Sequence, residues 1–304
     1  MTNEEIYLDL LRDVYENGTD RPDRTGVGVR GVFGRQTRYD LSTFPILTTK
    51  KMELKSIVSE LLWFVEGSGD ERRLAEIRFG KPREELTSRR TIWTDNAKAP
   101  YWVDKAKFDG DLGRVYGVQW RNWRSPVVVD PIGGADYYAA STAVDFVEVD
   151  QLENLIVGLK ENPYDRRHIL TAWNPGEITN MALPPCHVMS QFYIEGGKLS
   201  CMLTQRPNDL FLGSPYNIAS YAIFTSMIAQ VTGYRVGELV YSQGDVHIYH
   251  NHFSAVEEQL SRKPNNPAFL YMDPSIKKIE EFTLDSFELM GYDPHPAIKA
   301  EMAV

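Results

Sequence analysis

A predicted β-hairpin constrains the fold of this chain more than any other feature of its sequence. Two strand-like segments, Val188–Ile194 and Leu199–Gln205, flank Glu195-Gly196-Gly197, which is a strong hairpin turn. With the turn centred on its first glycine, the numbers of paired residues sum to about 392. This register places Cys186 opposite or beside Arg206. The sequence therefore predicts an antiparallel sheet that holds a cysteine and an arginine together at one end of a strand pair.

Cys186 is the candidate nucleophile. Arg206 would stabilise its thiolate, which is the reactive form of a cysteine, and Pro184-Pro185 would fix how the sulfur is presented. The alternative is that Cys186 is a small buried hydrophobic residue, as a free cysteine often is. Two further polar residues near it in the predicted hairpin, His187 and Asp209, favour the nucleophile.

The second cysteine and the overall composition indicate a reducing environment. Cys201 alternates with Leu199 and Leu203, so we expect it in the core, too far along the hairpin for a disulfide with Cys186. The N-terminus does not resemble a signal peptide, and no apolar run approaches the length of a membrane span. We therefore expect a cytoplasmic protein. The formal net charge of −9 argues against a dedicated nucleic-acid surface.

Residues 54–65 predict a buried helix. Apolar residues recur there at helical spacing, and Trp63 and Phe64 extend the apolar surface nearly all the way round. Glu60 falls between these two aromatic residues on a helical wheel, so burial is expected to raise the pKa of its carboxyl group. A raised pKa suits general acid–base chemistry. The alternative is a structural Glu60 paired with a buried arginine or lysine.

The remaining patterns mix helices with strands and indicate one α+β domain over residues 1–304. Further helices are expected over 4–16, 152–159 and 218–231. Asn3 is the expected N-cap of the first. Further strands are expected over 27–40, 168–173 and 238–249. Residues 79–112 and 124–147 are irregular, so we interpret both as surface excursions from a single core.

Four arginines could bind a phosphate, because a guanidinium can donate to two phosphate oxygens at once. They are Arg24, Arg166, Arg167 and Arg206. The alternative is that they are solvated surface residues of an acidic chain.

Three residues in the second half of the chain could bind the rest of a ligand. Asn217 carries an amide that both donates and accepts, as reading the edge of a heterocyclic ring requires, but an N-cap is the alternative. His247 and Tyr249 alternate on one strand face, so both could reach one ligand. The three histidines within 247–252 lack the spacing of a ligand set, and we expect no metal.

The segment Met181-Ala182-Leu183-Pro184-Pro185-Cys186-His187, followed by Gln191-Phe192-Tyr193, resembles the active-site segment of the folate-dependent thymidylate synthases. That family has nucleotide hydroxymethylases among its relatives. Further motifs extend the resemblance, in family order, over almost the whole chain. They are Asp23-Arg24-Thr25-Gly26, Thr48-Thr49-Lys50, Glu60-Leu61-Leu62-Trp63, Thr91-Ile92-Trp93, Tyr116-Gly117, Asp165-Arg166-Arg167, Phe211-Leu212-Gly213, Tyr216-Asn217-Ile218-Ala219-Ser220-Tyr221, His247-Ile248-Tyr249 and Ala303-Val304.

This resemblance implies a homodimer of α+β subunits that pack through their large mixed sheets, with buried helices against each sheet. It implies reductive methylation of dUMP to dTMP, with 5,10-methylenetetrahydrofolate as co-substrate and no metal. Cys186 would add to C6 of dUMP, and Glu60, with ordered water, would transfer protons at the pyrimidine O4 and at the methylene carrier. The surrounding catalytic network would comprise Tyr116, His187, Asp209 and Asn217.

The same resemblance assigns the binding residues. Arg24 and Arg206 would bind the phosphate, joined by Arg166 and Arg167 of the second subunit. Other parts of the nucleotide would contact Gln205, Asp209, Asn217, His247 and Tyr249, with Asn217 on the uracil edge and the last two on the sugar. The folate pocket would comprise Ile92, Trp93, Asp209, Leu212, Gly213, Tyr216, Ala303 and Val304.

Two enzymatic outcomes diverge from one intermediate, an exocyclic methylene on C5 of the nucleotide. Hydride from the folate gives dTMP, whereas water gives 5-hydroxymethyl-dUMP. Trp93 and Leu183 stand at the family's shielding positions and favour methylation. Pro207, where the family usually has serine, and the altered Glu301-Met302 keep hydroxymethylation open. A non-catalytic nucleotide- or RNA-binding relative is the third alternative, which the intact nucleophile, acid and arginines disfavour.

Overall fold

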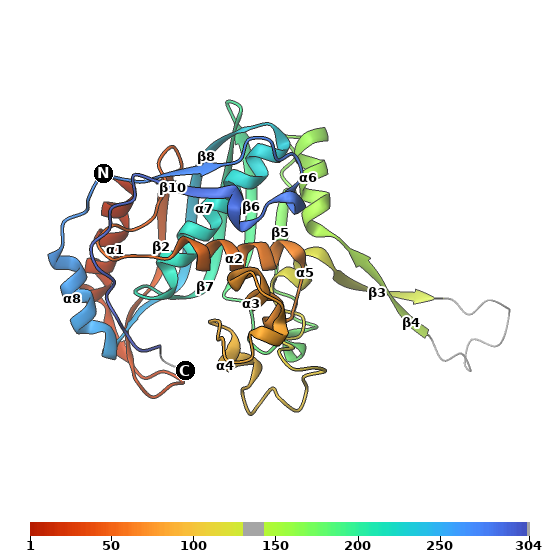
Figure 1. The fold of residues 1–304 in the computed structure, drawn as a ribbon, viewed down its shortest axis with the longest axis horizontal. Helices are drawn as coiled ribbons and strands as arrows, with labels where there is room; N and C mark the ends of the chain where they lie inside the picture. The colour runs from red at the N-terminus through yellow and green to blue at the C-terminus, as the bar shows by residue number, and fades with distance from the viewer. Residues whose placement is uncertain (130–142, 303–304) are drawn as a thin grey trace.

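A six-stranded mixed sheet organises the chain in the computed structural model, which describes residues 1–129 and 143–302. The strand order is β1-β2-β8-β7-β6-β5 (Figure 1). All neighbouring pairs are antiparallel except β7 and β8, which are parallel. The bounds are β1 Thr19–Arg21, β2 Val29–Asp40, β5 Ile169–Thr171, β6 His187–Glu195, β7 Lys198–Asp209 and β8 Arg235–Tyr249.

The predicted hairpin is confirmed as β6 and β7. His187 pairs with Gln205, and beyond a bulge after His187 the register shifts by one residue. The backbone N–H of Arg206 donates to the carbonyl of Cys186 over 3.0 Å, so the predicted neighbours adjoin. Gly196 and Gly197 have φ of 56° and 74°, a left-handed conformation that favours glycine and that this turn requires.

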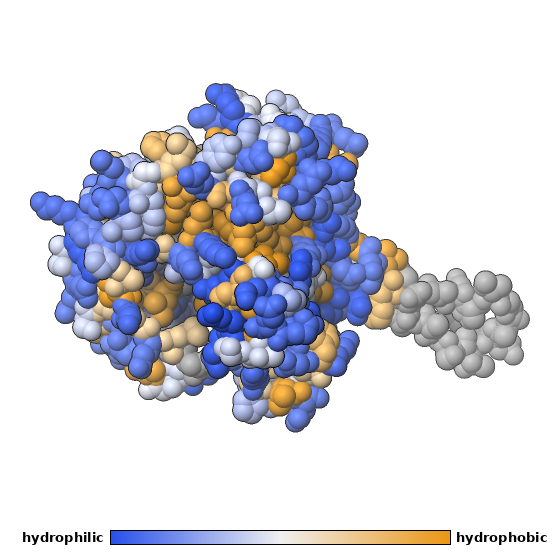
Figure 2. All heavy atoms as spheres, viewed as in Figure 1, coloured by the Kyte–Doolittle hydropathy of each residue, from blue (hydrophilic) through white to orange (hydrophobic). Residues whose placement is uncertain are grey.

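Two helices build layers on one face of the sheet. α7 (Gly213–Thr232) packs directly on β7 and β8, and α2 (Leu54–Glu66) packs on α7 (Figure 1). Trp63 and Phe64 are buried, which confirms the prediction for this helix. Figure 2 shows apolar side chains gathered in the middle of the molecule, over α7, with polar residues around them.

The remaining elements surround this core. They are α1 Asn3–Asn17, α3 Glu71–Phe79, η1 Arg83–Glu85, α4 Thr94–Ala97, α5 Gly117–Arg121, α6 Gln151–Glu161, η2 Ile178–Asn180, η3 His250–His252, α8 Phe253–Ser261, β9 Phe269–Met272, η4 Ile279–Glu281, η5 Leu284–Ser286 and β10 Phe287–Met290. No helix in the described ranges is long and apolar enough to span a membrane.

The two predicted surface excursions differ in structure. Residues 79–112 are more than an excursion, because Trp93, Trp102 and Leu112 from this segment are buried in the core. In the second, β3 (Trp123–Val129) and β4 (Ala143–Val149) form an antiparallel ribbon that extends away from the body (Figure 1). The rest of the predicted 124–147 excursion lies outside the described residues.

The start of α1 corrects one prediction and shows how the helix is fixed to the body. Thr2, not Asn3, is the N-cap, and it forms a capping box with Glu5. The Asn3 side chain instead donates to the carbonyls of Asp40 and Thr43. Asn3 therefore ties α1 to the end of β2.

Glu4 is a buried carboxylate that accepts hydrogen bonds from the segment before Lys50. The backbone N–H and hydroxyl groups of both Thr48 and Thr49 donate to it, over 2.6 to 2.9 Å. Hydrogen bonds to a charged acceptor are stronger than neutral ones, and buried donors without a partner are costly. Glu4 therefore fixes residues 48–50 against α1.

We predict that Glu4→Ala lowers the free energy of unfolding by about 3 kcal/mol, because it leaves four buried donors without their acceptor. Urea denaturation followed by circular dichroism measures the change. Glu16→Ala, at an exposed position on the same helix, is the matched control and should stay within about 0.5 kcal/mol of the parent chain. Equal effects of the two substitutions would contradict this role for Glu4.

Candidate active site

Cys186 lies directly before β6, in a partly buried position between Tyr116 and Arg206. Its backbone N–H donates to the Tyr116 hydroxyl over 2.7 Å. The Arg206 guanidinium donates to the carbonyls of Pro185 and Pro184 over 2.9 and 2.8 Å, and it stacks on Trp173. Arg206 thus orders the two prolines that present the thiol.

Burial has the largest effect on the pKa of Cys186. It raises the pKa of the thiol, while the charge of Arg206 and the hydroxyl of Tyr116 lower it by less. Arg206 therefore acts on the thiol in the predicted direction, but burial has the larger effect and the net pKa is raised. For Cys201, burial raises the pKa to about 12, and that side chain lies in the core as predicted.

Glu60 faces this site from α2. Burial raises the pKa of its carboxyl group, as predicted, and the carboxylate accepts from the Trp93 indole N–H over 2.7 Å. The Trp93 bond lowers the pKa by less, and the charge of Arg78 lowers it less again. The partner of Glu60 is therefore an indole rather than the buried arginine or lysine of the alternative interpretation.

Tyr116 lies between Cys186 and Trp93, the hydrogen-bond partner of Glu60. It has a φ of 26°, the only positive φ at a non-glycine residue in the described ranges. Its ring stacks on Phe64 and meets Trp93 and His187 edge to face, at centroid distances of 4.8, 5.7 and 5.2 Å. Packing on three sides holds this strained backbone in place, which places the hydroxyl at Cys186.

A buried polar network lies under the thiol. Burial lowers the pKa of His187 to about 4, so its ring is neutral at pH 7. Asn217 donates over 3.1 Å to the side-chain oxygen of Gln205, which also accepts from the Tyr241 hydroxyl. Asn217 lies in the second turn of α7, so its interpretation as an N-cap is wrong.

Sequence reasoning missed two further members of this network, Tyr241 and Asn208. Both are buried, and Asn208 donates to Ser214 and to Gln243. The sequence did contain a signal for Tyr241. Polar residues at core-facing positions of a strand must find buried partners, and the predicted strand 238–249 carries both Tyr241 and Gln243.

Asp209 shapes the turn from β7 into α7. Its carboxylate accepts from the backbone N–H groups of Phe211 and Leu212, both over 3.1 Å. Leu212, Gly213 and Tyr216 follow at the start of α7. Lys50 donates to the Phe211 carbonyl, and burial lowers its pKa to about 7 against the opposing charge of Asp209.

The candidate sugar residues and one candidate phosphate residue, Arg24, gather at the end of β8. The rings of His247 and Tyr249 meet edge to face at 5.2 Å, and His247 contacts Asp245. Arg24 is exposed on the adjoining loop, where the Asp23 side chain accepts from two backbone N–H groups. The positive charge of Arg24 acts on the Tyr249 hydroxyl. The structure therefore places these residues as one group.

Arg166 and Arg167 lie apart from that group. Both are exposed between α6 and β5, the edge strand opposite β1 and β2. The Arg167 side chain is 90% exposed. Of the candidate folate residues, Trp93 is buried and Ile92 exposed, whereas Ala303 and Val304 lie outside the described residues.

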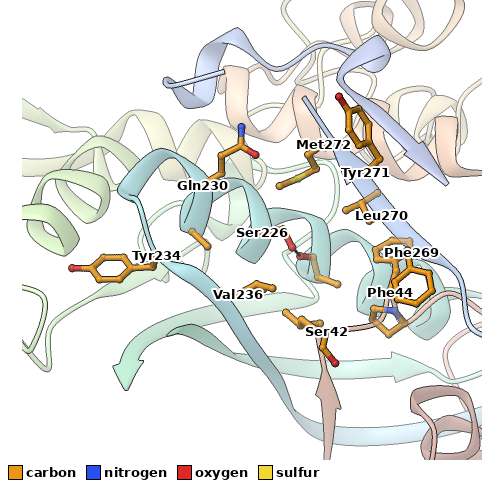
Figure 3. Close-up of a pocket in the computed structure, with 14 residues that line it drawn as sticks. Ser42, Phe44, Ser226, Gln230, Tyr234, Val236, Phe269, Leu270, Tyr271 and Met272 are labelled. Carbon is orange, nitrogen blue, oxygen red and sulfur yellow. Dashed lines mark hydrogen bonds between the residues drawn. The ribbon is translucent and has the colours of Figure 1, made fainter. Parts of the chain in front are cut away.

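Other possible sites are less suited to chemistry. A cavity of about 480 Å³ lies between α7, β9 and residues 41–45 (Figure 3). Its lining contains no charged side chain and none of the candidate site residues. In the described part of the chain, no group of three or more His, Cys, Asp or Glu side chains could hold a metal ion.

We predict that iodoacetamide alkylates Cys186 with a pH midpoint above that of a free cysteine, because burial raises the pKa of the thiol. Arg206→Gln should move the midpoint higher still, since it removes the neighbouring positive charge. The rate of adduct formation, followed by mass spectrometry against pH, measures both. Cys201 is the internal control and should stay unmodified in the folded chain. A midpoint below that of free cysteine would contradict this account.

Comparison with known families agrees with this arrangement. The thymidylate synthase family model matches residues 5–304, and so spans the candidate nucleophile, the buried carboxyl group and all four arginines. The described fold, a mixed α+β domain with a large sheet and buried helices, is consistent with it. The chain belongs to the thymidylate synthase family.

Proposed function

We propose that this chain is a thymidylate synthase that converts dUMP and 5,10-methylenetetrahydrofolate to dTMP and dihydrofolate. One observation carries the proposal: Tyr116 holds the Cys186 backbone while it packs against Trp93, the hydrogen-bond partner of Glu60. A nucleophile and a carboxyl group whose pKa is raised by burial thus flank one tyrosine. Family membership supplies the substrate class.

The nucleophile forms and later releases a bond to the pyrimidine. Cys186 loses its proton to solvent, and the thiolate adds to C6, which makes C5 a nucleophile toward the folate methylene. Loss of the C5 proton and cleavage of the carbon–nitrogen bond leave an exocyclic methylene on C5. Hydride from the tetrahydrofolate reduces that methylene, and the thiolate is expelled. The raised pKa of Cys186 makes Arg206 important for the first step, because its charge opposes the effect of burial.

Glu60 and the network under the thiol would serve the ring. A carboxyl group with a raised pKa is protonated over a wider pH range, so Glu60 can donate toward O4 and take a proton back. Asn217 would read O4 and N3 of uracil, with Gln205 and Tyr241 fixing its amide. The neutral His187 would add a hydrogen bond without a charge.

Hydride rather than water should capture the methylene. Trp93 is 6% exposed, and its bond to Glu60 fixes the indole plane. Leu183 packs partly buried against the core. Both are apolar, so they would exclude water from the reacting carbon. Hydroxymethylation of dUMP is the second candidate, because Pro207 and Glu301-Met302 depart from the family's pattern at the phosphate and in the tail.

A homodimer would complete the phosphate site. One face of β6 and β7 is buried under helices, whereas their alternate residues, such as Tyr193 at 62% exposure, are open. Packing of this face against a second copy would cover Tyr193 and bring Arg166 and Arg167 to the partner's Arg206. Because the reaction needs a reduced Cys186, we place the enzyme in the cytoplasm.

We predict that incubation with dUMP and methylenetetrahydrofolate yields dTMP and dihydrofolate in equal amounts, measured by chromatography and by the rise in dihydrofolate absorbance. Trp93→Gly should divert part of the product to 5-hydroxymethyl-dUMP, because it opens the reacting carbon to water. Trp93→Phe, which keeps one aromatic ring but loses the donor to Glu60, should still give mainly dTMP, at a lower rate. Hydroxymethyl-dUMP as the main product of the unaltered chain would favour the second candidate.

We predict that Cys186→Ala and the double variant Arg166→Glu/Arg167→Glu complement each other when coexpressed. Random pairing makes half of the dimers mixed, each with one complete site, so activity should reach about a quarter of the parent value. Cys186→Ala with Arg206→Glu is the matched control and should remain inactive, because Arg206 acts in its own chain's site. Equal activity in the two mixtures would show that Arg166 and Arg167 do not complete the partner's site.

A further inference from the structure

Residues 291–302 have no regular secondary structure, and hydrogen bonds with the body of the protein attach this C-terminal segment at successive points. In Figure 1 it passes in front of α1 and beside α8. Tyr292 donates to the carbonyl of Leu47, and Arg262 donates to the carbonyl of Pro296 over 2.7 Å. The last of these attachments in the described residues is at Glu301, whose carbonyl contacts His252 over 2.7 Å.

His252 is suited to hold that carbonyl. Its side chain is fully buried at the junction of η3 and α8. Because a carbonyl oxygen only accepts, the Nε2 atom must carry the proton. The Nδ1 atom is buried and without a partner among the described residues, so a second proton there would be an unpaired buried donor. The Nε2 donor of the ring is therefore used by the C-terminal segment.

The ring also adjoins both halves of the proposed substrate site. It meets the Phe211 ring at 5.5 Å and the Tyr249 ring at 5.7 Å. Phe211 belongs to the turn that Asp209 closes, which we assign to the folate, and Tyr249 to the group that we assign to the sugar. Asn251 adds a longer contact to the same carbonyl, over 3.4 Å. The segment's carbonyl is thus held beside the 209–213 turn by one buried donor.

We propose that His252 is a positioning residue that fixes the C-terminal segment against the folate side of the site. The proposal rests on the proposed function for its kinetic consequence, but the contact with Glu301 is independent of turnover. His252 does not touch the reacting atoms in this scheme. It acts through the segment, so its loss should affect the folate more than dUMP.

Two substitutions separate the donor from the ring. His252→Phe keeps a ring between Phe211 and Tyr249 but removes the donor. His252→Gln removes the ring but can place an amide N–H where Nε2 lies. Thermal unfolding of both variants checks that they fold. Hydrogen exchange of the backbone amides in residues 297–302 then reports on the segment without any need for substrate.

We expect His252→Phe to speed exchange of the 297–302 amides about fivefold, the factor that corresponds to one hydrogen bond between neutral groups, and to raise the KM for methylenetetrahydrofolate by a similar factor. The dissociation constant of dUMP should stay within about twofold, and His252→Gln should restore both altered values. Unchanged exchange in His252→Phe would overturn the proposal, as would an equal loss of dUMP affinity. If the parent chain forms no dTMP, the proposed function fails, but the exchange measurement still decides whether His252 holds the segment.

Discussion

The pairing of β6 with β7 is the constraint on which the candidate site depends. Its register puts the carbonyl of Cys186 against the N–H of Arg206, so the thiol and the guanidinium emerge from adjacent strands. β7 then leads through the Asp209 turn into α7, which returns across β7 and β8 and carries Asn217 over the strand pair. A slip of one residue would turn Cys186 to the other face and separate it from Gln205, the partner of Asn217.

Burial, more than charge pairing, sets the electrostatics of this site. It raises the pKa values of Cys186 and Glu60 and lowers those of His187 and Lys50. All four shifts favour the neutral form, as expected where a low dielectric penalises charge. In the proposed reaction, the charge of the nucleotide phosphate would be met by exposed arginines rather than by these buried groups. The site thus combines buried polar groups whose pKa shifts favour the neutral form with exposed arginines.

Much of this could be predicted from the sequence, but only where the cause is local. The 54–65 periodicity and the pair of aromatic residues beside Glu60 were enough to predict a buried helix and a raised carboxyl pKa, and both are confirmed. The effect of Arg206 on the Cys186 pKa has the predicted direction, but the larger effect of burial was not predicted, because it depends on how tightly distant segments enclose the sulfur. The interpretation of 79–112 as an excursion missed Trp93 as a core residue for the same reason.

What the sequence by itself determined is therefore the set of elements, the hairpin register and the identity of the candidate groups, since turns and periodicity are properties of neighbouring residues. The tertiary structure decided what each group contacts. It gave Glu60 an indole partner from a segment 33 residues away and joined Asn217 to Tyr241 through Gln205. It also placed the carbonyl of Glu301 at His252, 49 residues earlier in the chain. Such contacts depend on how the helix and sheet layers pack and on the water that this packing excludes. No pattern among neighbouring residues in the sequence determines them.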